Sequence, residues 1–331
     1  MANLPRTLAT LILLIIGCNA SVAAESSLAY PARSIRLVVT YPPGGGTDLV
    51  ARQVGQKLAE SWGQPVIIDN RPGGGGVIGA EIVANAPADG YTYLFGTSAA
   101  LVTQPLLVGK VPYDPLIAYA PVSLLTVDVQ VLYINGALPV NTLKELITYA
   151  RAKPGALSYA SAGLGAPNHL NMEQLKHVAG INIVHVPYQG SGPSVIDLLA
   201  GRVQLIWSSA VALVPHAKSG KLKALAVGGS HRMPALPEVP TIAEAGLPNY
   251  EPNMPWFSIF VPAKTPKPII DKINAQVVRT LNDPETVKKL AGYGYAAHSS
   301  SPEELGNHLR KEYQRMKALI GAIKLNASNV Q

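Results

Sequence analysis

The sequence predicts an α/β protein with two lobes, each a mainly parallel sheet flanked by helices. Short β-rich runs alternate with helical patterns along the chain, as expected when helices connect parallel strands. The alternation occurs in two successive sets, and each set has a glycine-rich turn between an early strand and a helix. The chain has 331 residues, 48% hydrophobic and 14% charged, which suits two folded cores and excludes a disordered chain.

Residues 1–24 are predicted to be a secretory signal peptide. Arg6 supplies a positive charge, the apolar run LATLILLIIG follows, and small residues up to Ala24 provide a cleavage site. The apolar run is too short to span a membrane. Cleavage removes Cys18, the only cysteine, and so excludes disulfides and thiol chemistry. A lipobox ending at Cys18 is the alternative, and both interpretations place the folded protein in the periplasm.

The charge of the chain favours anionic ligands without indicating nucleic acid. The net charge is +7, and loss of Arg6 with the leader leaves 26 basic and 20 acidic residues, or +6. A modest positive charge steers small anions toward a protein. The basic residues are scattered, with no cluster and no aromatic platform, so no nucleic-acid partner is expected.

The first set of elements is expected between residues 35 and 97. The runs IRLVVTY, PVIID and YTYLFGT are typical of strands, because they are apolar and bounded by turn residues. The run TDLVARQVGQKLAESWG is expected to be a helix, since Val50, Val54 and Leu58 recur at four-residue spacing. A shorter helix is expected over AEIVANA.

The second set is expected between residues 142 and 229. Strands are expected at LSYAS, INIVHVP, VQLIWSS and LKALAVGG, and helices over TLKELITYARAKPG, after AGLGAPN and at about 192–200. A proline-rich connector then leads to one more strand, WFSIFVP, and to two helices, the last over residues 302–324.

The turn VVTYPPGGGTDLVAR is the main candidate for a binding loop. No Gly-Lys-Ser/Thr follows it, so it is not a Walker A loop, and Thr47-Asp48-Leu49 after the glycines does not complete G-x-G-x-x-G. A glycine turn before a helix still directs free N–H groups toward an anion. Thr47 or Asp48 is expected to cap the helix.

The literal G-x-G-x-x-G at residues 74–79 is not expected to bind a dinucleotide. That motif needs an acidic residue at the end of the next strand, and YTYLFGT ends in Thr97. We expect a permissive loop in which Gly79 allows close packing. The histidines have no zinc spacing, and no H-E-x-x-H or G-x-S-x-G is present, so no metal, cofactor or catalytic residue is expected.

Polar residues of the second set admit two interpretations. His169 stands at a predicted helix start, where it is either a structural group or a ligand contact. Tyr188 lies in a turn that is either a cap or a polar wall of a cleft, and His185 is expected to be core or edge. Two lobes facing each other at the carboxyl ends of their strands would form such a cleft.

The ordered set of motifs resembles the tripartite tricarboxylate transporter substrate-binding proteins, also called Bug receptors. The resemblance runs from about Tyr30 to the C-terminus. It is carried by VVTYPPGGGTDLVAR, GQPVIIDNRPGGGGVIGAE, PADGYTYLFGT, LSYASAGLGAPNHL, VHVPYQGSGPSVIDLLAGRVQLIW, KLKALAV, ALPEVPTIAEAGLPNYE and SPEELGNHLRKEYQRMK. Family members often have small hydroxyl residues in place of Pro167-Asn168, and an acid in place of Ser208. The missing acid is a hint against an amino-acid ligand.

The resemblance implies a periplasmic receptor of the Venus-flytrap (periplasmic-binding-protein) architecture, and we expect the protein to be a monomer. Such a receptor captures a small organic carboxylate in the interlobe cleft and delivers it to the inner-membrane permease subunits of a tripartite transporter. Lobe 1 would comprise residues 25–129 and 251–331, and lobe 2 residues 130–250. The alternatives are ligand sensing for a signalling system and an enzyme acting on a small acid, for which Asp48 and His169 are the only nearby candidates.

Ligand binding is expected from backbone amides and hydroxyl groups of both lobes. The expected ligand-binding residues are Tyr41, Gly44, Gly45, Gly46, Thr47, Asp48, Thr97, Ser98, Ser161, Gly163, Asn168, His169, Tyr188 and Ser208.

Overall fold

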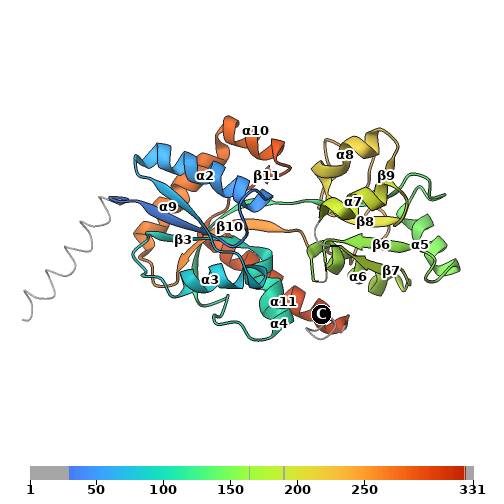
Figure 1. Ribbon diagram of the computed structural model, residues 1–331, viewed down its shortest axis with the longest axis horizontal. Helices are drawn as coiled ribbons and strands as arrows, with labels where there is room; N and C mark the ends of the chain where they lie inside the picture. The colour runs from blue at the N-terminus through green and yellow to red at the C-terminus, as the bar shows by residue number, and fades with distance from the viewer. Residues whose placement is uncertain (1–29, 164, 189–190, 324, 326–331) are drawn as a thin grey trace, which may run out of the picture.

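Two sheets flanked by helices form the two lobes of the protein (Figure 1). The computed structural model describes residues 30–163, 165–188, 191–323 and 325. The predicted two-lobe α/β class is confirmed. The predicted signal peptide and Cys18 lie outside the described residues. Among the described residues, no helix has both the length and the apolar character needed to cross a bilayer.

Lobe 1 is built on a six-stranded sheet with the order β11-β4-β10-β3-β1-β2. Its strands are β1 (Ile35–Val39), β2 (Val66–Asn70), β3 (Thr92–Thr97), β4 (Tyr119–Val127), β10 (Trp256–Pro262) and β11 (Ala296–Ala297). Its helices are α2 (Gly46–Trp62), η1 (Gly74–Gly76), α3 (Val77–Ala84), η2 (Ala99–Thr103), α4 (Gln104–Val108), α9 (Lys267–Asn282), α10 (Pro284–Gly292) and α11 (Pro302–Ala322).

Lobe 2 is built on a five-stranded sheet with the order β7-β6-β8-β5-β9. Its strands are β5 (Gln130–Asn135), β6 (Ser158–Ser161), β7 (Val184–Pro187), β8 (Leu205–Ser209) and β9 (Leu222–Val227). Its helices are α5 (Leu143–Ala152), α6 (Pro167–Ala179), α7 (Ser191–Leu199) and α8 (Ala210–Lys218).

Both sheets are mixed, which corrects the expectation of mainly parallel sheets. In lobe 1, β1 is parallel to β2 and β3, but β10 is antiparallel to β3 and β4, and β11 is antiparallel to β4. In lobe 2, β6 is parallel to β7 and β8, whereas β5 is antiparallel to β8 and β9. The reason is that the chain enters lobe 2 with β5 and re-enters lobe 1 with β10. Both strands start at a crossing, so they run opposite to the strands of the βα units, which end at that edge.

Helices cover both faces of the lobe 1 sheet because its strand side chains alternate between the faces. Leu37 and Val39 of β1 pack with α2, α9 and α10, whereas Val38 packs on the opposite face with α3, α4 and α11. In lobe 2, α5 and α6 cover one face of the sheet, and α7 and α8 cover the other. Each lobe is therefore a three-layer unit with its own core.

Some helix boundaries follow from local sequence. Ser301 and Glu304 form a capping box at the start of α11, and the Thr142 side chain accepts a hydrogen bond from the Glu145 N–H group at the start of α5.

The prediction that Gly79 allows close packing is confirmed, because a Cβ there would lie 2.9 Å from the Arg71 carbonyl oxygen. Three helices, not the two expected, follow β10, because α9 and α10 are separated at Asp283, which caps α10.

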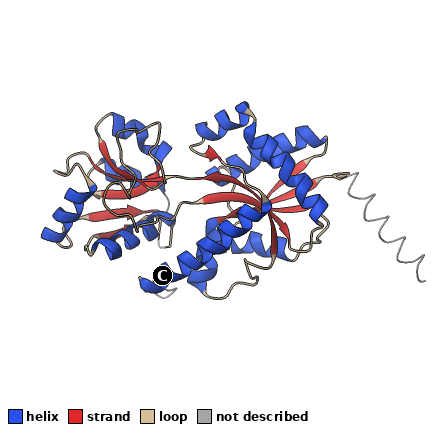
Figure 2. Cartoon of the chain, turned by 180° about the vertical axis from the view of Figure 1, so that it is seen from behind, coloured by secondary structure: helices blue, strands red, loops and turns tan. Residues whose placement is uncertain are grey.

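The direction of the strands places all the expected binding loops at the interface between the lobes. The chain crosses once between β4 and β5 and again between β9 and β10 (Figure 2). In lobe 1, β10 starts at this crossing, so its antiparallel neighbour β3 ends there, as do β1 and β2. In lobe 2, β5 starts at the crossing, so β8 ends there, together with β6 and β7.

The lobes also touch away from the two crossings. Leu170 of α6 is fully buried and belongs to the lobe 1 cluster that contains Leu107 of α4. A Cβ at Gly165, in the loop before α6, would lie 2.7 Å from the Leu107 side chain. The loop between β6 and α6 therefore sits directly against lobe 1.

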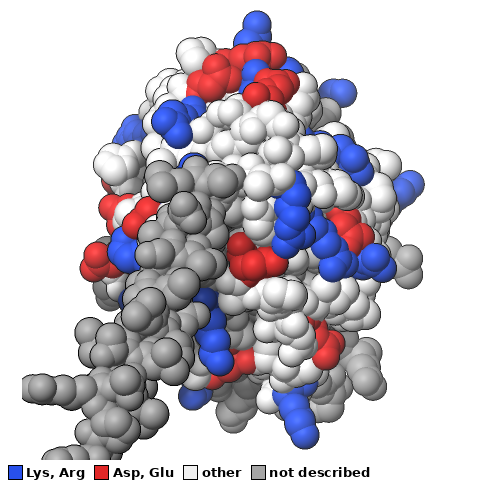
Figure 3. Space-filling model, turned by 90° about the vertical axis from the view of Figure 1, so that its left-hand side faces the viewer, with Lys and Arg blue, Asp and Glu red and all other residues white. Residues whose placement is uncertain are grey.

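The outer end of lobe 1 has mixed charge. Basic and acidic side chains are interspersed on the part of this face that the grey residues leave visible (Figure 3). Lys57 pairs with Glu285 at 2.7 Å and Lys267 pairs with Asp271 at 2.6 Å, both at exposed positions of the lobe. Opposite charges that neutralise each other in this way create no extended field of one sign.

Candidate functional site

Hydrogen bonds to Asp48 hold the glycine turn of lobe 1, residues 44–46, in place. The Asp48 carboxylate accepts hydrogen bonds from the Gly44 N–H group at 2.9 Å, from Arg52 Nε at 2.9 Å and from Asn70 Nδ2 at 3.0 Å. Burial opposes ionisation of Asp48, but these donors hold its pKa below the ordinary value. Asp48 is 2% exposed, so it supports the loop and has no free surface for a ligand.

The expectation that Thr47 or Asp48 caps α2 is wrong. Gly45 is the N-cap, with extended backbone angles and no side-chain cap bond, and Gly46 is the first helical residue. The first hydrogen bond of the helix runs from the Leu49 N–H group to the Gly45 carbonyl oxygen at 3.0 Å. The N–H groups of residues 46–48 therefore precede the helical ladder and form a positive end that favours an anion.

A tyrosine from the far end of the sequence completes this loop. A Cβ at Gly46 would collide with the hydroxyl group of Tyr295, which lies just before β11. Any larger residue at position 46 would displace the Tyr295 side chain. Sequence analysis missed Tyr295, because nothing local to residue 295 indicates contact with residue 46.

Tyr41 and Thr97 lie together at the ends of β1 and β3. The Tyr41 hydroxyl group donates to the Gly75 carbonyl oxygen at 3.4 Å, and burial raises the pKa of Tyr41 although the nearby Thr97 side chain opposes the shift. Thr97 also accepts a hydrogen bond from the Ala100 N–H group at 3.2 Å, so it begins the helical turn that follows. Ser98 is 4% exposed beside it. These residues form a second strand-end wall next to the glycine turn.

In lobe 2, Ser161, Gly163, Asn168 and His169 form one internally bonded loop. The Ser161 hydroxyl group accepts from the Gly163 N–H group at 3.1 Å, and Asn168 Oδ1 accepts from the Ala162 N–H group at 3.1 Å. His169 Nδ1 accepts from the Gly165 N–H group at 3.1 Å. These side chains hold the loop in shape, and the loop backbone lies at the carboxyl edge of the sheet.

His185 forms an aromatic stack with Tyr159 and His169 behind this loop. The ring centroids of Tyr159 and His185 are 4.7 Å apart, and those of His169 and His185 are 4.3 Å apart. Burial, with His169 close by, lowers the pKa of His185 to about 4, and burial also lowers the pKa of His169. Both rings are therefore neutral at neutral pH.

The Ser161–His185 contact resembles the pairing of a nucleophile with a general base, but a substrate could not reach the Ser161 hydroxyl group. Ser161 Oγ lies 2.6 Å from His185 Nε2, a pairing that the sequence did not indicate. Acyl transfer needs a nucleophile that a substrate can reach. Ser161 has no exposed surface, and its hydroxyl group is already bonded within the loop. The geometry favours a structural hydrogen bond.

We expect the His185 stack to make lobe 2 sensitive to acid. Since the folded pKa lies below the ordinary 6.5, the unfolded chain binds the proton first as the pH falls, and stability is lost between about pH 6.5 and 4. One proton with this shift costs about 2 kcal/mol of unfolding free energy between pH 7 and 5. In urea titrations at both pH values, His185→Gln should lose about 2 kcal/mol less than the wild type.

Exposed His177, on the same lobe, provides the control for this experiment. His177→Gln should lose as much stability as the wild type between the two pH values. Equal acid losses in His185→Gln and the wild type would contradict the assignment.

Tyr188 and Ser208 occupy the ends of β7 and β8. The Tyr188 hydroxyl group donates to Asp197 Oδ2 at 2.7 Å, and its N–H group donates to the Ser161 carbonyl oxygen at 3.0 Å. Ser208 is 9% exposed and pairs with Val131 of β5. Both residues thus stand at the edge facing lobe 1, although the Tyr188 hydroxyl group is engaged within lobe 2.

Asp128 is the functional candidate that sequence analysis missed at the crossing. It lies between β4 and β5, and its Oδ2 accepts from Gln130 Nε2 at 2.8 Å. Burial raises the pKa of Asp128 to about 6, although the Ser209 and Gln130 side chains favour its charged form. The sequence around it, TVDVQV, has no glycine turn or motif that marks it.

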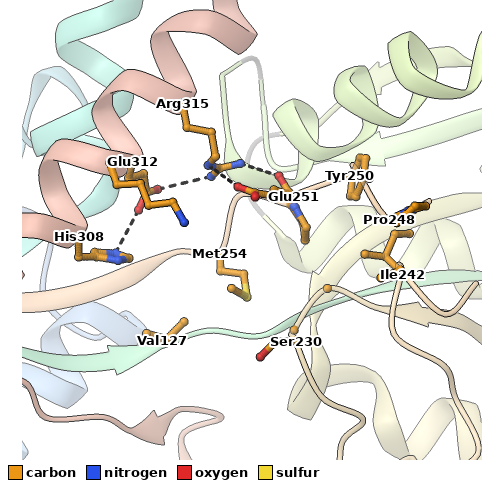
Figure 4. Close-up of a pocket in the computed structure, with 15 residues that line it drawn as sticks. Val127, Ser230, Ile242, Pro248, Tyr250, Glu251, Met254, His308, Glu312 and Arg315 are labelled. Carbon is orange, nitrogen blue, oxygen red and sulfur yellow. Dashed lines mark hydrogen bonds and ion pairs between the residues drawn. The ribbon is translucent and has the colours of Figure 1, made fainter. Parts of the chain in front are cut away.

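A separate pocket of about 440 Å³ lies at the hinge between the lobes. Figure 4 shows α11 side chains on one side, including Glu312 and Arg315, and Tyr250 and Met254 of the connector before β10 on the other. None of the expected binding residues lines it. Since both lobes contribute walls, its shape depends on their relative orientation. Among the described residues, no cluster of three His, Cys, Asp or Glu side chains is placed to hold a metal.

Two lobes joined by two crossings, with amide-rich strand ends facing each other, define a solute-binding protein. A sequence model described as tripartite tricarboxylate transporter family receptor matches residues 50–325, and the chain belongs to this family. Protein BugT of Bordetella pertussis is 38% identical over 323 residues, covering 96% of this chain and 97% of that protein. The resemblance to Bug receptors is therefore confirmed.

Two solved structures similar to this chain carry carboxylates. One is described as R. palustris Rpa4515 with adipate, with 36% identity, a TM-score of 0.76, and coverage of 90% of this chain and 99% of that chain. The other is described as MatC (Rpa3494) from Rhodopseudomonas palustris with bound malate, with 32% identity, a TM-score of 0.72, and coverage of 88% and 100%.

Proposed function

We propose that this protein is a periplasmic receptor that binds a small organic carboxylate between its lobes and delivers it to the permease of a tripartite transporter. The observation that carries the proposal is the start of α2. Its N–H groups at residues 46–48 precede the helical ladder at the edge of lobe 1 that faces lobe 2. This arrangement binds anions without an arginine.

The remaining expected binding residues support the same proposal in two ways. Tyr41, Thr97 and Ser98 offer hydroxyl groups beside the glycine turn, and the lobe 2 loops offer backbone groups from the opposite side. Neutral donors in a cleft suffice, because micromolar affinity requires only about 8 kcal/mol. The lobe boundaries at 129/130 and 250/251 belong to this proposal, and the crossings beside β5 and β10 support them.

Related receptors support the chemical class of the ligand. The similar structures hold adipate and malate, which are both dicarboxylates. Rotation of the lobes about the crossings would close the site over such a ligand, as in other two-lobe receptors. We place the protein in the periplasm because of the predicted leader, and we propose a monomer without a cofactor.

The proposal is tested by a panel of acids in thermal-shift and calorimetric titrations. Adipate, malate, citrate and benzoate are compared with adipamide, which has the length of adipate without its charge. At least one acid should raise the melting temperature and bind with a micromolar or lower dissociation constant, while adipamide should not. If none of the acids binds, the carboxylate proposal is wrong.

Two further measurements separate the alternatives. Co-purification with a permease rather than a histidine kinase would distinguish transport from sensing. An acid recovered unchanged after long incubation, as judged by NMR, would contradict an enzymatic role.

A further inference from the structure

Asp128 stands where the two lobes meet. Its N–H group donates to the Pro255 carbonyl oxygen at 2.7 Å, so the two crossings are joined at this residue. Val127 before it pairs with Trp256 in the lobe 1 sheet, and Gln130 after it pairs with Ser209 in the lobe 2 sheet. The carboxylate is therefore fixed between the facing strand ends of both lobes.

The groups around this carboxylate are neutral. Gln130 on β5 donates a hydrogen bond to it, and the Ser209 side chain at the end of β8 lies nearby. The nearby titratable group is the Tyr295 phenol from the segment before β11. Among the residues that the structure describes, no Lys, Arg or His forms an ion pair with Asp128. An unpaired, half-buried carboxylate is costly in its charged form.

Tyr295 connects Asp128 to the proposed anion site. The Tyr295 hydroxyl group lies over Gly46 at the start of α2, and the Tyr295 pKa is raised to about 12 by burial and by the Asp128 carboxylate. One tyrosine side chain thus contacts the helix end and lies near the acid. A carboxylate ligand bound at α2 would lie close to Asp128, and two adjacent carboxylates cannot both be ionised without a large cost.

We propose that Asp128 is a ligand-contact residue that binds as the neutral acid, donating a hydrogen bond to the ligand carboxylate, so that binding takes up one proton from solvent. This inference rests on the proposed function and deepens it. No covalent bond changes: the proton moves from water to the Asp128 carboxylate, and the ligand remains an anion. Burial already raises the pKa of Asp128 to about 6, which makes this protonation accessible near neutral pH.

The test measures the affinity of whichever of adipate, malate and benzoate binds most tightly, between about pH 7 and 8.5, where these acids are fully ionised. The wild-type association constant should fall by about tenfold per pH unit. Asp128→Asn, which keeps the shape and a donor, should bind with little pH dependence. Asp271→Asn serves as the control on the surface of lobe 1, where the carboxylate pairs with Lys267, and should retain the wild-type slope.

Each outcome decides the question. A flat wild-type profile, or a slope that persists in Asp128→Asn, would overturn the inference while leaving the receptor function intact. If no acid binds either protein at any pH, the proposed function fails and the inference with it. Calorimetry in two buffers of different ionisation enthalpy should also show uptake of about one proton by the wild type at pH 8 and none by Asp128→Asn.

A ligand-free measurement checks the premise separately. Because the folded pKa of Asp128 is raised, its charged form weakens the fold as the pH rises through about 6. Asp128→Asn should therefore melt at a higher temperature than the wild type at pH 8, and at the same temperature at pH 4. If the melting temperatures of Asp128→Asn and the wild type differ by the same amount at both pH values, Asp128 does not titrate between them.

Discussion

Gly45→Val is expected to abolish ligand binding while the protein stays folded. Gly45 has a φ of −83°, which valine adopts readily, and a Cβ there meets no atom within 4 Å. The valine side chain would fill the space in front of the α2 amide groups, where the ligand carboxylate is expected. We expect affinity for the best acid of the panel to fall at least about 100-fold, or ~2.7 kcal/mol, measured by calorimetry.

The stability of this variant should change little. Valine is a poorer N-cap residue than glycine, so the unfolding free energy should fall by about 1 kcal/mol. Gly321→Val in α11 is the matched control, since a Cβ there also meets open space, and it should bind normally. Retention of wild-type affinity by Gly45→Val would show that the loop is only a turn. Gly46 is less suitable, because substitution would displace Tyr295.

The sequence predicted the parts of the site that are local in the chain. A glycine turn between a strand and a helix is visible in the residue pattern, and the two βα sets placed the loops of both lobes at strand ends. The same reasoning misassigned the α2 cap. Asp48 was expected to accept from helix N–H groups, but its carboxylate is held by Gly44, Arg52 and Asn70, and the Asn70 contact joins β2 to α2.

The parts that were missed depend on long-range contacts. Tyr295 reaches Gly46 only because β11 joins the sheet beside β4. Because β11 consists of two alanines, it has no recognisable strand pattern in the sequence. No helix or strand is predicted from the sequence within residues 98–141. This stretch nevertheless contains β4 and β5, which carry the chain from one lobe to the other. Asp128 lies in this stretch, and only the antiparallel pairing on each side places it between the strand ends.

Asn171→Ala is expected to give the largest loss of stability among these variants. Asn171 is fully buried in α6, where its Nδ2 donates to the Asn253 carbonyl oxygen at 3.0 Å and its Oδ1 accepts from the Asn253 N–H group at 2.5 Å. Alanine would leave both backbone groups of Asn253 unpaired in the interior. The free energy of unfolding in urea should fall by about 3–5 kcal/mol.

The consequence of this change should extend to binding, because of what the two hydrogen bonds connect. Asn171 belongs to the helix whose first turn holds Asn168 and His169, and Asn253 belongs to the crossing that leads into β10. Losing the link should loosen the lobe 2 loop relative to the hinge and weaken ligand affinity. Exposed Asn307→Ala, which removes only a bond to Arg310, should cost under about 0.5 kcal/mol. A loss below about 1 kcal/mol for Asn171→Ala would mean that water replaces both bonds and that the loop is positioned by packing of Leu170 instead.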